Sequence, residues 1–260
     1  MTLLRKISHL YPNDHNLSLE LIDDYGLYLL DQQFMESGKR LSEVEGMPVS
    51  TLKNWVEVVP NFILQEQLDY NYDILVAKVQ YGLKRFNEEQ RAVYNDVMQS
   101  YDQNLGNTFI LHSASGCGKS FVCNTIAAAV HMGQHENCRV ALCVASSGIA
   151  SLLLNGGRTT HLHFKIPISI FNDSNYNISK DSLLSKVLQQ TGIIIWDEVP
   201  MQHKFAVKAL DNTLKNILEN DKPFGRITVL FGGDFCQTLP IVPRGSKHQV
   251  LEASLKDSRL

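Results

Sequence analysis

Four short apolar runs alternate with helical patterns in the chain after residue 107. Short continuous apolar runs are typical of parallel strands that are covered on both faces. We therefore expect strands at 108–112, 139–145, 192–197 and 226–232. The helical patterns between these runs span 119–131, 148–154, 180–190 and 203–220. This alternation predicts an α/β fold with a doubly wound, mainly parallel sheet and right-handed crossovers.

The pattern before residue 86 is different, because helical periodicity dominates it. The segments 19–37 and 62–83 have that periodicity, and Glu45-Gly46-Met47-Pro48 interrupts the pattern between them. We predict a mostly helical accessory segment at 1–85, packed on an α/β domain at 86–260.

Composition places the chain among soluble globular proteins and limits its partners. Hydrophobic residues make up 44% of the 260 residues. No apolar run approaches the ~20 residues that a membrane-spanning helix needs, and residues 1–10 lack a signal-peptide pattern, so we expect no membrane partner. A net charge of −3 means that any nucleic-acid binding must come from a local groove. The five cysteines, an odd number without disulfide-like spacing, predict a reducing compartment.

The strongest chemical signal is a glycine-rich loop between the first strand and the first helix of this domain. Such a loop crowds backbone N–H groups around phosphate oxygens, and the helix that follows adds its positive end. The predicted nucleotide-binding residues are Ser115, Gly116, Cys117, Gly118, Lys119 and Ser120. Lys119 would reach the β- and γ-phosphates, and the Ser120 hydroxyl would bind Mg²⁺. Ser113 stands where the usual pattern has glycine, which we interpret as a modest weakening of the loop geometry.

The apolar run at 192–197 ends in Asp197, and Glu198 follows it directly, so two carboxylates are adjacent there. Together with the phosphate loop they predict ATP hydrolysis, in which Asp197 coordinates Mg²⁺ and Glu198 activates the attacking water. Gln237 follows the next predicted strand, where an amide could contact the γ-phosphate or that water. The spacing alone leaves a purely structural role for Gln237 equally open.

Two further groups of polar residues are weaker candidates. Asn87 is a plausible helix N-cap, and the amide of Gln90 in the same turn could donate to and accept from an adenine edge, although an exposed glutamine is ordinarily solvated. The loops after the second strand offer hydroxyls, amides and one arginine, which suit a sugar–phosphate backbone. The candidate DNA-binding residues there are Ser147, Thr159, Thr160 and His161, and His161, His163 and Phe164 could stack on bases. The alternative for His161 and His163 is a surface or capping role.

Taken in order, these segments resemble the Pif-type (petite integration frequency) DNA helicases of superfamily one, and most of all the helicase part of Helitron transposon proteins. The motifs that carry the resemblance lie at 86–90, 113–120, 145–150, 156–161, 197–201 and 232–242. The resemblance covers 86–260 and implies a RecA-like P-loop NTPase domain that uses ATP and Mg²⁺ and moves 5′ to 3′ on single-stranded DNA. It further implies roles in DNA repair, recombination and telomere maintenance, and hence a nuclear location.

The resemblance also assigns roles position by position. Gln90 would recognise adenine, Gln237 would sense the γ-phosphate, and the segment 159–161 would contact the DNA strand. Helicases of this family have two RecA-like domains with ATP between them, whereas this chain ends at Leu260, just beyond the third helicase motif. We therefore expect the second domain and its arginine finger, which contributes about 10³–10⁵ in rate in related ATPases, to be absent.

On this interpretation the chain is a fragment that binds nucleotide, hydrolyses it slowly and does not unwind DNA. Two alternatives have different functions. One is a nucleotide- and DNA-binding module without turnover, and the other is a small-molecule phosphotransferase, which the lack of an arginine-rich lid segment disfavours. The sequence leaves the oligomeric state open.

Overall fold

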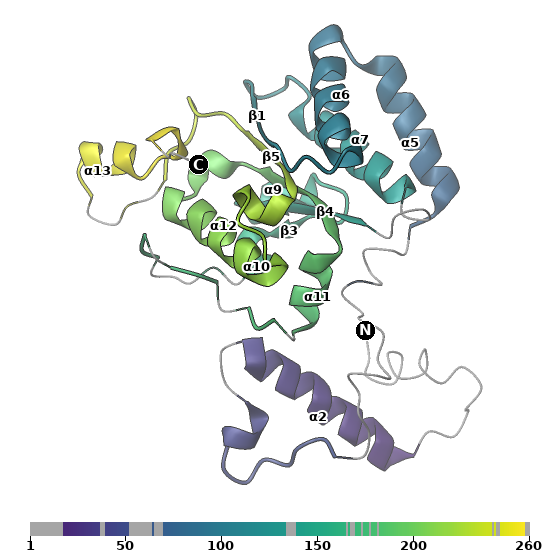
Figure 1. Cartoon of the computed structure of the whole chain (residues 1–260), viewed down its shortest axis with the longest axis vertical. Helices are drawn as coiled ribbons and strands as arrows, with labels where there is room; N and C mark the ends of the chain where they lie inside the picture. Colours follow the sequence, from purple (N-terminus) through teal and green to yellow (C-terminus); the bar gives the residue numbers. More distant parts are fainter. Residues whose placement is uncertain are drawn as a thin grey trace.

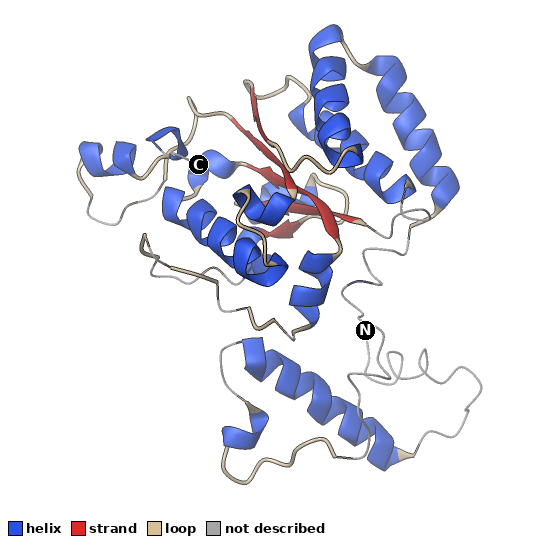
Figure 2. Cartoon of the chain, in the orientation of Figure 1, coloured by secondary structure: helices blue, strands red, loops and turns tan. Residues whose placement is uncertain are grey.

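A parallel sheet covered by helices on both faces forms the centre of the molecule (Figures 1 and 2). The computed structural model describes residues 18–36, 40–51, 64, 70–133, 139–164, 166, 170–172, 174–176, 178–180, 182–240, 242 and 245–257. Among these residues the sheet has five strands in the order β1-β5-β4-β2-β3, and every neighbouring pair is parallel. The predicted α/β class and parallel sheet are confirmed.

Each strand and helix predicted after residue 107 is found close to its predicted bounds, and the structure adds several short elements. The strands are β1 (Thr108–His112), β2 (Val140–Ala145), β3 (Arg158–Thr159), β4 (Thr191–Asp197) and β5 (Thr228–Gly233). The helices are α2 (Leu19–Glu36), α5 (Tyr72–Arg85), α6 (Glu88–Asp102), α7 (Lys119–Met132), α9 (Gly148–Leu152), α10 (Thr160–Phe164), α11 (Leu183–Gln189), α12 (Lys204–Leu218) and α13 (Lys247–Glu252). Short 3₁₀ turns are η1 (Leu41–Glu43), η2 (Val199–Met201), η3 (Pro223–Arg226) and η4 (Leu255–Asp257).

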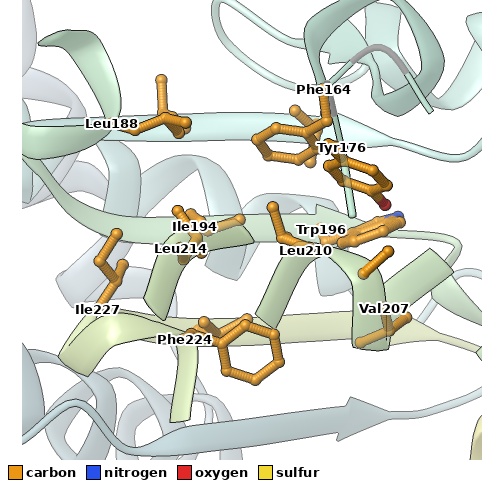
Figure 3. Close-up of a cluster of buried hydrophobic side chains, with 14 of the residues drawn as sticks. Phe164, Tyr176, Leu188, Ile194, Trp196, Val207, Leu210, Leu214, Phe224 and Ile227 are labelled. Atoms are coloured by element: carbon orange, nitrogen blue, oxygen red, sulfur yellow. The ribbon is translucent and has the colours of Figure 1, made fainter. Parts of the chain in front are cut away.

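One face of the sheet packs on α12 (Figure 3). Alternate residues of a strand point to opposite faces, and Ile194 and Trp196 of β4 therefore lie together on this side. They meet Val207, Leu210 and Leu214, which recur on α12 at the three- and four-residue spacing that makes one apolar helix stripe. All five side chains are fully buried, so this packing fixes where the end of β4 lies.

The opposite face packs on α6 and α7. Ile193 and Ile195 of β4 point to this side and meet Ile126 of α7. Helix α5 in turn packs against α7 at close range, because a Cβ on Gly82 would lie 2.5 Å from the Thr125 side chain. The phosphate-loop helix is therefore held between the sheet and α5.

The N-terminal segment contains the helix α2, which agrees with the helical pattern predicted at 19–37. Tyr25 and Tyr28 of α2 and Leu41 of η1 are buried. The carboxylate of Asp24 accepts hydrogen bonds from the Ser50 hydroxyl at 3.0 Å and from the Thr51 backbone N–H at 2.8 Å. This part of the chain thus has local packing of its own.

The second helical pattern was predicted at 62–83, and within it Leu64 and the residues from Tyr72 onward are helical, while residues 62–63 lie outside the described part. Helix α5 starts at Tyr72, where Asn71 provides the N-cap by accepting from the Ile74 N–H, and residues 65–69 lie outside the described part. The division of the chain at residue 85 stays a prediction. Over the residues that are described, none of the helices is both long and apolar enough to span a bilayer.

Candidate nucleotide-binding site

The sheet topology brings the three predicted catalytic segments to one edge. In parallel sheets ligands bind at the carboxyl ends of the strands. The phosphate loop follows β1, the two carboxylates end β4, and the loop that carries Gln237 follows β5, which lies between β1 and β4. Three segments that are far apart in the sequence therefore meet at neighbouring strand ends.

The phosphate loop has the backbone conformation that its glycines permit. Gly116 and Gly118 both have φ of +81°, in the left-handed region that a side chain strains. Gly118 is also the N-cap residue of α7 and supplies no side-chain cap to that helix. The first N–H groups of α7 therefore point toward the loop, as they do where helices bind anions.

Backbone carbonyl groups of the loop hold the side chain of Lys119. Its ammonium donates to the backbone oxygen of Ser113 at 2.8 Å and to that of Ala114 at 3.1 Å. The loop thus closes around a positive charge at the start of α7. This is the arrangement that a phosphate group requires, since N–H dipoles and one cation converge on the same place.

A hydroxyl and a buried carboxylate meet next to the loop. The Ser120 Oγ lies 3.5 Å from Oδ2 of Asp197, which is 3% exposed. The approach is possible because Gly232 of β5 has no side chain, and a Cβ there would lie 2.8 Å from Oδ1 of Asp197. Oxygen ligands of this kind fit Mg²⁺, which is held by one or two protein oxygens while phosphates and waters complete its shell.

Glu198 follows in a strained conformation at the mouth of the site. Its φ of 55° lies in the left-handed region, and its backbone N–H donates to Oδ1 of Asp197 at 2.9 Å. Burial raises the pKa of the Glu198 carboxyl, the negative charges of Asp197 and Asp234 raise it further, and Lys119 opposes them. Backbone strain of this kind is concentrated at functional sites, and a carboxyl with a raised pKa suits proton transfer.

The β5 loop reaches the phosphate loop directly. The Ser115 hydroxyl donates to Oε1 of Gln237 at 3.4 Å. Asp234 fixes the turn between them, because its Oδ1 accepts from the Cys236 N–H at 2.9 Å and its backbone oxygen accepts from the Gln237 N–H at 3.2 Å. The structure therefore places Gln237 at the same site as the other predicted catalytic residues.

Gln90 lies against the loop, but both ends of its amide are engaged. Its Oε1 accepts from the Asn87 N–H at 3.2 Å in a capping box, and its Nε2 donates to the Cys117 oxygen at 3.0 Å. The N-cap predicted at Asn87 is confirmed. Adenine recognition by Gln90 would replace one of these two hydrogen bonds and stays a prediction.

The candidate DNA-binding residues form a second group around β3 and the N-terminus of α9. His161 is exposed and Thr159 is half-buried. The hydroxyl of Ser147 caps α9 by accepting from the Ala150 N–H at 3.2 Å. Thr160 is fully buried, so its side chain lies beneath this surface and not on it.

The prediction that His163 and Phe164 stack on bases is wrong in this structure. His163 is 6% exposed and Phe164 is fully buried, where its ring lies 6.0 Å from that of Trp196. Both residues belong to α10, and Phe164 is part of the core cluster that contains Ile194 and Trp196 of β4. The sequence alone does not distinguish an aromatic residue that is buried in the core from one that is exposed to solvent when it follows a polar loop.

Two features of this region escaped the sequence analysis. The side-chain amide of Gln202, the residue after η2, donates to Oγ1 of Thr160 at 3.4 Å. The indole N–H of Trp196 donates to Oγ of Ser146 at 3.1 Å. Helix α9 also exposes Ile149 and Leu152, which are 81% and 84% exposed. The helical pattern at 148–154 predicts the helix but does not indicate which of its apolar residues face solvent.

Comparison with known proteins gives one family. A family model described as PIF1-like helicase matches residues 85–260. The chain is 33% identical over 146 residues, 55% of its length, to "ATP-dependent DNA helicase Pif1" of Psychrobacter sp.. It is 30% identical over 173 residues, 63% of its length, to "ATP-dependent DNA helicase RRM3" of Saccharomyces cerevisiae. These matches cover 21% and 22% of the two relatives, so the chain spans about a fifth of their length.

Solved structures agree with the fold. A Pif1 helicase from Bacteroides, solved with ADP-AlF3 and single-stranded DNA, superposes with a TM-score of 0.51 at 23% identity. That match covers 64% of this chain and 36% of the other. A second structure, of two coordinating Pif1 helicases at forked DNA, gives a TM-score of 0.50 at 23% identity, with 64% and 37% covered. At this identity the likeness establishes a shared fold.

Proposed function

Because this chain belongs to the PIF1-like helicase family, we propose that residues 86–260 are the RecA-like, ATP-hydrolysing domain of a DNA helicase. The observation that carries the proposal is the convergence of Lys119, Ser120 and Asp197 at one edge of the sheet. The relatives named ATP-dependent DNA helicases support the same activity.

Nucleotide binding is assigned to the phosphate loop. The N–H groups of 115–120 and the Lys119 ammonium would hold the phosphates, and Lys119 would leave the Ser113 and Ala114 oxygens to do so. Ser120 and Asp197 would hold Mg²⁺, which when bound neutralises charge on the β- and γ-phosphates. Gln90 is proposed to recognise the adenine edge.

Hydrolysis is assigned to Glu198 and Gln237. Glu198 would take a proton from the attacking water, and the hydrogen bond from its backbone N–H to Oδ1 of Asp197 supports this role. Gln237 would orient that water or contact the γ-phosphate. Binding or loss of the γ-phosphate would then alter the hydrogen bond between Gln237 and Ser115.

The DNA contact is assigned to Ser147, Thr159 and His161, with Thr160 acting from below the surface. Single-stranded DNA is the proposed ligand, and the backbone atoms of 159–161 would hold its phosphates. Movement 5′ to 3′, roles in repair, recombination and telomere maintenance, and a nuclear location complete the proposal. These finer points are inferred from the family resemblance of the motifs.

Nucleotide binding is the first test. We would titrate the chain with a fluorescent ATP analogue and Mg²⁺, and compare it with Lys119→Ala and with Lys208→Ala, a half-buried lysine on α12 whose ammonium donates to Oδ1 of Asn172. The expected result is loss of binding in Lys119→Ala alone. Equal binding by all three proteins would overturn the assignment of the loop.

Turnover is the second test. ATP hydrolysis should rise when single-stranded DNA is added, and the DNA affinity should fall as salt rises. Nucleotide binding with turnover that DNA leaves unchanged would instead support a binding module that acts through partners.

A further inference from the structure

Three side chains with metal-binding atoms converge beside the nucleotide site, outside the set that the proposed function uses. His112 ends β1, and Asp234 and Cys236 follow β5. One ligand atom from each, a ring nitrogen, a carboxylate oxygen and the thiol sulfur, all lie within 4.8 Å of one another. The parallel pairing of His112 with Gly233 is what brings the two segments together.

The donor set is typical of zinc and not of magnesium. Zinc binds cysteine sulfur, histidine nitrogen and carboxylate oxygen at about 2.0–2.3 Å, which places tetrahedral ligands roughly 3.3–3.8 Å apart. The three atoms already lie within 4.8 Å of one another, which is about an ångström beyond that spacing. The Mg²⁺ position proposed at Ser120 and Asp197 offers oxygen atoms only, which zinc-type metals favour less.

The local structure prepares two of the three ligands. Asp234 is 6% exposed, and its Oδ1 accepts from the Cys236 N–H at 2.9 Å, which fixes the carboxylate and the cysteine backbone relative to each other. A carboxylate has a second oxygen with which to bind a cation. Hydrogen-bonded carboxylates of this kind are usual around metal sites, because the second partner orients the ligand. His112 and Cys236 are exposed, so an ion could enter from solvent.

We infer that His112, Asp234 and Cys236 form a binding site for a zinc-class divalent ion, with a fourth position open to water. Cys236 would bind as the thiolate, and its proton would pass to solvent. Since Ser113 follows His112 and Gln237 follows Cys236, a bound ion would fasten the β5 loop to the start of the phosphate loop. The site is independent of the proposed function, because it needs neither Lys119 nor a nucleotide.

Cobalt is the probe for this site, since Co²⁺ replaces zinc and reports its ligands by absorption. We would titrate the nucleotide-free 260-residue chain with Co²⁺ in the presence of excess Mg²⁺. The expected result is a thiolate-to-cobalt charge-transfer band with the intense visible bands of a four-coordinate ion, both removed by stoichiometric Zn²⁺. Absence of these bands in the folded protein would overturn the inference.

Variants assign the signal to the residues. Cys236→Ser and His112→Ala should each lower the Co²⁺ affinity by about 100-fold or more. The loss of a residue that only orients a metal ligand already costs about 10–100-fold in affinity, and these two residues would bind the ion directly. Cys117→Ser and His248→Ala are matched controls, because they remove the other described exposed cysteine and an exposed histidine of α13. A band that survives Cys236→Ser, or that Cys117→Ser removes, would contradict the site. Lys119→Ala should keep the band, which separates this test from that of nucleotide binding.

Discussion

The amide of Gln202 donates to the hydroxyl of Thr160 across 3.4 Å, and both side chains are buried. Gln202 follows the turn that begins after Glu198, and Thr160 lies under the candidate DNA surface. A second contact runs in parallel, since the Ser146 N–H donates to the backbone oxygen of Asp197 at 3.1 Å. The segment 197–202, which carries the two carboxylates proposed to act on ATP, is thus joined by direct hydrogen bonds to the segments that are proposed to hold DNA.

The first prediction concerns this link. Thr160→Val keeps the shape of the side chain and removes the hydroxyl, so we expect DNA to stimulate ATP hydrolysis less while nucleotide affinity is unchanged. The lost hydrogen bond is worth about 0.5–1.5 kcal/mol in stability. A double-mutant cycle with Gln202→Ala should show that the two changes are not additive. Additive losses in DNA stimulation would mean that the contact carries no coupling.

The second prediction concerns Glu198 as the general base. Glu198→Gln should keep ATP binding and lower hydrolysis by about 10²–10⁴-fold, the usual contribution of a positioned base. Glu219→Gln is a matched control, because Glu219 also has a left-handed backbone, with φ of 51°, and lies far from the site at the end of α12. Loss of nucleotide binding in Glu198→Gln would instead assign this side chain to the binding step.

The third prediction is the pH dependence that follows from Glu198. Burial and the neighbouring carboxylates raise the pKa of this carboxyl, so the folded chain holds the proton more tightly than the unfolded chain does. Ionisation of Glu198 therefore lowers stability as pH rises from the unfolded pKa through the folded pKa. The free energy of unfolding of Glu198→Gln, relative to the unchanged chain, should rise across that window. Urea unfolding at several pH values without nucleotide tests this, and a difference that is constant with pH would contradict it.

The fourth prediction compares two glycines of the phosphate loop. Gly116 and Gly118 share a φ of +81°, so alanine at either position pays the cost of a left-handed residue, about 1–2 kcal/mol. A Cβ on Gly116 meets open space, whereas one on Gly118 would lie 2.8 Å from Nε2 of Gln90. Gly118→Ala should therefore destabilise the nucleotide-free chain more than Gly116→Ala does, as measured by thermal unfolding. Equal losses would mean that Gln90 moves away freely.

The sheet could be predicted from the sequence because its strands are short apolar runs between clear turns. Strand β1 lies at the predicted residues, and β4 and β5 differ from their predicted ranges by no more than two residues at either end. Strand β3, only Arg158–Thr159, was not predicted, since two residues have no periodicity. The pairing of β3 with β2 creates it, and such a tertiary effect leaves no local pattern.

The parts of the candidate site that lie within single sequence motifs could be predicted from the sequence. The phosphate loop and the two carboxylates belong to contiguous segments, each next to a strand. The contacts between segments were not predictable, because Ser115 meets Gln237, and Gln202 meets Thr160, only through the strand order. The burial of Phe164 has the same origin, since its environment depends on Trp196 and Tyr176 and not on its sequence neighbours.

The place of β5 in the sheet has a consequence for how the protein is made. In the described part of the chain β1 is paired with β5 alone, yet β5 comes after the other four described strands in the sequence and leaves the ribosome after them. During translation the phosphate loop would emerge early, on a strand without a neighbour, and would acquire its native support only after residue 233 has been added. A chaperone or another nascent segment has that whole interval in which to bind the unpaired β1 edge.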